Sequence, residues 1–192
     1  MKIPILSTLC LVAIASIAFA QAPASNLPGT PPAPGGTGTT ETDKSKQLTS
    51  NDKAFVKKVL EGMYFEMNLT DKGKRDSAKL DGTKKLAEKV NGDLNKIWGD
   101  LAGLLEPKEV PHELATGDKN KAQRISKAGD RYDKELLDVV EKETKQLERA
   151  FESASKTSQN ATIKQVTTNW LPTIKGHGDE IEKAAKEASK AK

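Results

Sequence analysis

The sequence predicts an all-α protein, an antiparallel four-helix bundle, and three observations support this fold class. Apolar residues recur at the 3.6-residue spacing of a helix in four separate segments. No segment alternates apolar and polar residues with the period of two that is typical of a strand. Short polar or proline-containing stretches separate the four segments, so each apolar stripe can be buried by packing against the others.

The first helix is expected at residues 52–70, because Ser50, Asn51 and Asp52 offer N-caps. The polar stretch 71–76 follows, and Gly73 within it is the predicted stop signal. The apolar stripe of this helix repeats every four residues and consists of Phe55, Val59, Met63 and Met67, with Val56 and Leu60 alongside.

The second helix is expected to begin at Ser77 or Thr83 and to run to Leu105. Pro107 and Pro111 end it, because proline cannot donate the helical hydrogen bond and clashes with the preceding turn. Its stripe contains Leu86, Val90, Leu94, Ile97, Leu101 and Leu104, widened by Trp98 and Leu105.

The third helix is expected to be long, over residues 117–156, and the fourth to run from Asn160 to the C-terminus. Pro172 lies inside the fourth pattern, so we expect a kink near Asn169 or two abutting helices there. The third stripe consists of Ile125, Ala128, Tyr132, Leu136, Val140, Thr144, Leu147, Phe151 and Ala154. The fourth consists of Ile163, Val166, Trp170, Ile174, His177, Ile181 and Ala184.

Residues 1–20 are typical of a secretory signal peptide. Lys2 precedes an apolar run over residues 3–19 that is short for a membrane span, and small residues precede a cleavage point between Ala20 and Gln21. The protein is therefore predicted to be periplasmic or secreted. Cys10 is the only cysteine and lies within this segment, so the mature chain can form no disulfide and use no thiolate.

The remaining chain divides into three parts. Residues 21–50 are rich in Pro, Gly and Thr and predict a disordered linker, because they hold too few apolar residues to offset the entropy of ordering. Residues 51–185 form the predicted bundle, and residues 186–192 a lysine-rich tail. This tail is either a solvated, fraying helix end or a weak contact with an anionic surface. No second apolar stretch is long enough to be a transmembrane helix.

Composition excludes several classes of function. The chain has 31 basic and 27 acidic residues and a net charge of +4, a mixed-charge surface without the clustered cations and aromatic residues of a nucleic-acid-binding protein. The sequence contains no Gly-rich phosphate loop after a strand and no Gly-x-Ser-x-Gly nucleophile motif.

Five short motifs together resemble a known family. They are 52–55 (DKAF), 62–66 (GMYFE), 87–94, 132–133 (YD) and 171–177 (LPTIKGH). In this order they resemble the exported, ferritin-like bacterial proteins of the domain-of-unknown-function family number 4142, over residues 50–185. The resemblance implies a ferritin-like up-and-down bundle in the periplasm or cell envelope, and no settled activity.

The resemblance also implies a set of inward carboxylates and histidines. Its glutamate falls on Glu66 and the histidine after Leu-Pro on His177, but Leu94 and Thr144 stand where two further histidines are usual. If Glu66 and His177 pair, the carboxylate would raise the pKa of the imidazole. The other interpretation of His177 is a buried histidine bonded to Glu66 or a backbone carbonyl. The candidate metal ligands are Glu66, His177, Asp93, Asp133 and Glu143; His112 is expected to be solvated.

Two hypotheses follow for the function. The first is an exported, non-enzymatic helical bundle of the cell envelope with a binding or structural role, no cofactor and an unidentified envelope partner. The second is a metal-binding or redox protein that holds iron or manganese through Glu66 and His177 with the other carboxylates.

Overall fold

The computed structural model describes residues 48–190, and within that range it is entirely helical, with no strand. This confirms the predicted all-α class. The predicted signal peptide, its cleavage point at Ala20 and Gln21, and residues 21–47 of the predicted linker lie outside the described range. The helices are α1 (Ser50–Thr70), α2 (Lys72–Arg75), α3 (Asp81–Ala102), α4 (Thr116–Ser126), α5 (Tyr132–Thr157) and α6 (Ala161–Ala188), with 3-10 turns at Pro107–Glu109 and Gly129–Arg131.

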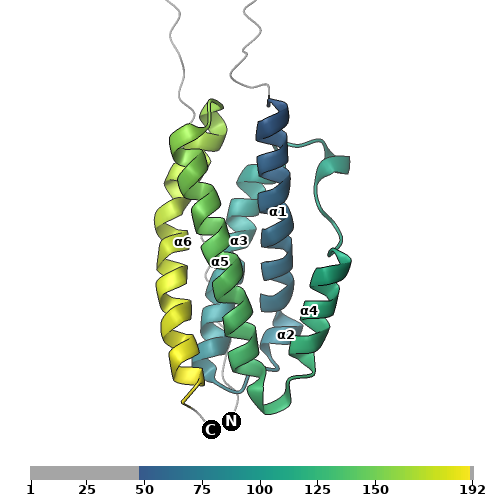
Figure 1. Ribbon diagram of the computed structural model, residues 1–192, viewed down its shortest axis with the longest axis vertical. Coiled ribbons are helices and arrows are strands. Elements are labelled where there is room, and N and C mark those ends of the chain that lie inside the picture. Colours follow the sequence, from purple (N-terminus) through teal and green to yellow (C-terminus); the bar gives the residue numbers. More distant parts are fainter. Residues whose placement is uncertain (1–47, 191–192) are drawn as a thin grey trace, which may run out of the picture. The chain divides into compact units, whose positions relative to one another are not determined.

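Four long helices surround the core. α1 packs on α3 and α5, and α6 packs on α5 and α3, with the α5–α6 contact the most extensive. In Figure 1, α1 and α6 run in the opposite direction to α3 and α5, so each of these packed pairs is antiparallel. The predicted stripes meet in one core, whose largest fully buried side chains are Phe65, Phe151, Leu60, Met63, Leu69, Leu94, Ile97, Leu101, Ile125, Leu136, Ile163 and Ile174.

α1 begins two residues earlier than predicted, because its N-cap is Thr49 and not Ser50, Asn51 or Asp52. The Thr49 hydroxyl accepts a hydrogen bond from the Asp52 backbone N–H at 3.1 Å, and the Asp52 carboxylate accepts one from the Thr49 backbone N–H at 3.0 Å. This is a capping box, which satisfies two N–H groups that the helix itself leaves unpaired. Gly73 does not stop α1; it lies within α2, which follows directly.

Replacing Thr49 by alanine is expected to lower the free energy of unfolding by about 1 kcal/mol, since one side of the capping box is lost. Ser50→Ala is the matched control, because Ser50 is exposed and lies inside the helix. Urea unfolding followed by circular dichroism measures both variants. If Ser50→Ala lowers the free energy of unfolding more than Thr49→Ala does, the N-cap is Ser50 and not Thr49.

α3 ends at Ala102, earlier than the predicted Leu105, and Pro107 opens a 3-10 turn. Five stripe residues of the second helix are buried as predicted: Leu86, Val90, Leu94, Ile97 and Leu101. Leu105 is also buried, although it lies outside the helix.

The prediction of one long third helix over residues 117–156 is wrong, because the structure has two helices there, α4 and α5, joined by a turn. Gly129 has φ +56°, a left-handed conformation that glycine adopts without steric cost and that ends a right-handed helix. The short 3-10 turn Gly129–Arg131 then leads into α5 at Tyr132. Of the predicted stripe, only Ala128 falls in this break.

Of the two alternatives expected around Pro172, a pair of abutting helices is wrong, because α6 is continuous through Pro172. The kink near Asn169 stays a prediction. Proline leaves the carbonyl four residues earlier, that of Thr168, without its helical donor. Both Pro172 and Thr168 are exposed, so water can hydrate that carbonyl. α6 continues to Ala188, into the predicted tail. In residues 48–190 no helix has both the length and the hydropathy to cross a membrane.

Candidate functional site

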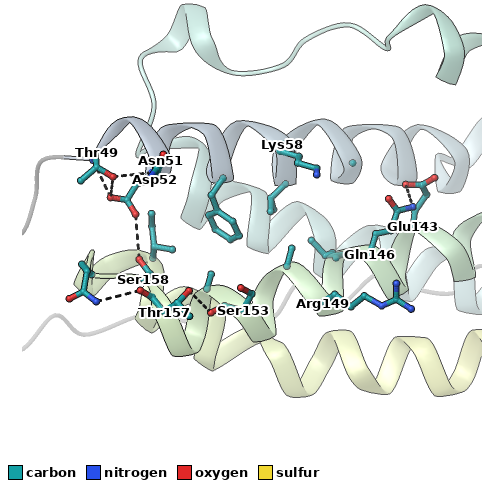
Figure 2. A pocket seen from close by; sticks show the side chains of 18 residues that line it. Thr49, Asn51, Asp52, Lys58, Glu143, Gln146, Arg149, Ser153, Thr157 and Ser158 are labelled. Atoms are coloured by element: carbon teal, nitrogen blue, oxygen red, sulfur yellow. Dashed lines mark hydrogen bonds between the residues drawn. The ribbon is translucent and has the colours of Figure 1, made fainter.

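An elongated groove of about 830 Å³ separates α1 from α5 near the start of α6 (Figure 2). Asp52 on α1, the N-cap Thr49 that precedes α1, and Ser158 after α5 lie at one end of it, and Glu143 lies at the other. Its volume is within the range of about 300–1,000 Å³ typical of small-molecule sites. The groove is therefore large enough for a ligand.

The groove has an apolar floor because parts of the α1 and α5 stripes face it. Gly62, Ala150, Ser153 and Ala154 lie along its walls, and their small side chains leave the space between the two helices unfilled. Phe55 is only partly buried, as expected for a stripe residue without full cover on this side. The apolar lining residues are Phe55, Val59, Leu147, Ala150, Ala154 and Ile163.

Four charged side chains line the groove, and the two acids already have partners. Asp52 belongs to the capping box, and its other oxygen lies 3.5 Å from the Ser158 hydroxyl. Glu143 lies 3.7 Å from the Lys121 ammonium. In contrast, Lys58 on α1 and Arg149 on α5 have no ion-pair or hydrogen-bond partner among the described residues.

Glu66 lies inside the bundle and outside this groove's lining. It is 1% exposed, and the Thr144 hydroxyl donates to its Oε1 at 2.6 Å. Burial raises the pKa of Glu66 to about 8; the Thr144 hydrogen bond opposes the shift and the negative charge of Glu143 adds to it. Glu66 is therefore mostly protonated at neutral pH.

His177 does not pair with Glu66 or with a backbone carbonyl, which corrects the expectation from the sequence. Its Nε2 lies 3.2 Å from the Asp93 Oδ2, between α6 and α3. Burial lowers the pKa of His177, and Asp93 opposes that shift without overcoming it. The imidazole is therefore neutral at neutral pH, and not protonated as the predicted ion pair required. The pKa of Asp93 is lowered by its hydrogen bond from Lys96 first and by His177 second.

Asp133 has a structural position at the base of the bundle. It is 6% exposed, and its two oxygens accept the backbone N–H groups of Lys79 at 2.8 Å and Leu80 at 3.0 Å. These residues immediately precede α3, so Asp133 ties the start of α3 to the first turn of α5. His112 is exposed, as predicted, and its backbone carbonyl accepts the Tyr64 hydroxyl at 2.9 Å.

The structure brings His177 and Asp93 into contact and places Glu143 close enough to Glu66 to affect its pKa, but it does not bring the five candidate metal ligands together. Glu66 bonds to Thr144, His177 to Asp93, Asp133 to backbone, and Glu143 to Lys121. Residues 48–190 contain no group of three or more His, Cys, Asp or Glu side chains arranged to hold a metal ion. The iron or manganese hypothesis stays a prediction.

The sequence analysis missed the groove and the residues that line it. The signal available was indirect: Gly62 is adjacent to Met63 in the α1 stripe, and Ala150, Ser153 and Ala154 follow one another at helical spacing on α5. Small residues on facing helices indicate either close approach or unfilled space, and only the separation of α1 and α5 decides between them.

One of the comparisons with known proteins identifies a family that this chain matches. A family model described as "Domain of unknown function (DUF4142)" matches residues 37–184. No curated protein and no solved structure matches the chain.

Proposed function

The chain belongs to the DUF4142 family, whose description assigns no activity, and from this premise we propose that it is an exported, non-enzymatic binding protein of the cell envelope. The observation that carries the proposal is the groove between α1 and α5, with its apolar floor and two cations, Lys58 and Arg149, that have no partner within residues 48–190. Export is inferred from the signal-peptide pattern at residues 1–20.

The buried polar groups support a binding role over a catalytic one. A catalytic acid, base or nucleophile must reach the reacting atoms of a substrate. Glu66 and His177 are each almost fully buried and bonded to another side chain of the bundle, away from the groove lining. Among the described residues, the lining of the groove includes no histidine, tyrosine or cysteine, and its two acids, Asp52 and Glu143, are bonded to other groups of the protein. This lining favours a site that holds a ligand.

We also infer a ferritin-like arrangement of the four long helices. α3 and α5 run in the same direction, and the segment that joins them contains α4, which packs on α5. One long connection between two antiparallel helix pairs is the pattern of ferritin-like folds.

The binding proposal is tested with a neutral, environment-sensitive fluorescent probe, N-phenyl-1-naphthylamine, and a variant that fills the groove. A Cβ added at Gly62 meets nothing within 4 Å, so Gly62→Phe places a ring in the groove without a backbone clash. We expect the parent to enhance the probe's fluorescence and Gly62→Phe to weaken binding at least about tenfold, because the apolar volume is occupied.

Gly99→Phe is the matched control, because Gly99 is exposed on α3 and its added Cβ also meets nothing within 4 Å. This control should bind the probe as the parent does. Absence of saturable probe binding by the parent, or equal loss in both variants, would contradict the proposed function.

A further inference from the structure

We propose that the ligand of this groove is a single-chain anionic amphiphile, an acyl chain that ends in a carboxylate. This inference rests on the proposed binding function and adds the chemical class of the ligand. The apolar floor would take the chain, and Lys58 and Arg149 would take the head group.

The shape and lining of the groove favour an acyl chain. Apolar side chains line both walls of the groove, Phe55 and Val59 on α1 and Leu147 and Ala150 on α5. Phe55 and Ala150 are only partly buried, so they present accessible apolar surface to a ligand. An extended acyl chain buries apolar area along its whole length, and each CH₂ group that leaves water favours binding. The exposed lining residues Lys58, Arg149 and Ser153 show that the groove borders on solvent, which lets a polar head stay hydrated.

The charges of the lining favour an anionic head group. Glu143 is paired with the Lys121 ammonium at one end of the groove. Asp52 keeps its negative charge at the other end, where it accepts hydrogen bonds from neutral groups, so the negative charge of the lining is confined to the two ends. Lys58 lies on the α1 wall and Arg149 on the α5 wall, and neither has a partner of opposite charge in residues 48–190 (Figure 2). An Arg guanidinium binds a carboxylate through two parallel hydrogen bonds, and a Lys ammonium adds a point charge.

Two amphiphiles with the same chain and opposite head groups test this assignment. Decanoate and decyltrimethylammonium, both below their micelle concentrations, compete with the neutral probe on the purified full protein, and calorimetry measures decanoate binding directly. We expect decanoate to bind about tenfold more tightly than the cation. The double variant K58Q/R149Q should remove this preference while the neutral probe still binds.

The matched control is K57Q/K142Q, which removes the same net charge from the same two helices. Lys57 and Lys142 are exposed and do not line this groove. This control should keep the preference for decanoate. Equal affinity for both amphiphiles in the parent, or the same loss of preference in the control, would overturn the inference.

The outcomes separate the inference from the proposed function. Saturable binding of the neutral probe without preference for decanoate leaves a binding groove but rejects the anionic ligand. If binding of the probe weakens as the protein concentration rises, a second copy of the chain occupies the groove. That result also rejects the anionic ligand. Failure of the parent to bind any of the probes rejects the proposed function itself.

Discussion

Raising the pH from 4.5 to about 8 should lower the free energy of unfolding of the parent by about 3–5 kcal/mol more than that of a Glu66→Gln variant. The pKa of Glu66 is about 8 in the folded protein and its ordinary value is 4.5. Between these values the folded chain holds a proton that the unfolded chain has released. Stability from this group is therefore fully present below pH 4.5 and is lost as the pH rises through 8.

Urea unfolding of the parent and Glu66→Gln at several pH values measures this difference. Gln is neutral at every pH and is nearly the size of protonated Glu, so its curve should lack this slope. Glu61→Gln is the control, because Glu61 is an exposed glutamate on the same helix, and its curve should follow the parent. Parallel curves for the parent and Glu66→Gln would show that Glu66 does not hold a proton when folded.

Asp133→Ala should lower the free energy of unfolding by about 2–4 kcal/mol, the second-largest effect that we expect. The substitution removes the acceptor of two backbone N–H groups, those of Lys79 and Leu80, at the start of α3. It also removes a negative charge that the N-terminus of a helix favours. Asp133→Asn retains one acceptor oxygen and should lose about half as much.

Asp130→Ala is the matched control, because Asp130 lies three residues away and its exposed carboxylate makes an ion pair with Lys79. Exposed ion pairs contribute little to stability because solvent screens them, so this variant should remain close to the parent. Urea unfolding at pH 7 measures all three variants. Equal losses for Asp130→Ala and Asp133→Ala would contradict the anchoring role of Asp133.

The sequence predicted the helices because their signal is local. An apolar stripe at helical spacing can be seen in the sequence without knowing which helix packs against it. A stripe this wide is expected to face the core, and its residues are buried in the structure: Leu86, Val90, Leu94, Ile97 and Leu101. The spacing also placed the start of the fourth helix at Asn160, and the structure shows this residue as the N-cap of α6, where its side chain accepts the Ile163 N–H at 3.1 Å. The match of the family model likewise depends only on the order of residues along the chain.

The local signals were less informative at glycine and proline. Gly129 divides the predicted third helix, whereas Pro172 leaves α6 intact. Glycine's left-handed backbone conformation is selected by the turn that the neighbouring helices require. An exposed proline can stay in a helix when tertiary packing holds both sides and water takes the freed carbonyl.

By itself the sequence thus determined the helical class, the core-facing stripes and the family, because each depends on the spacing of residues that are close together along the chain. Only the tertiary structure decided which polar groups meet: Glu66 with Thr144, 78 residues apart, and His177 with Asp93, 84 residues apart. It also decided that a groove lies between α1 and α5, lined by two cations without partners in the described part of the chain. These contacts depend on the rotation and separation of packed helices, and those are set by the fit of all side chains in the core together.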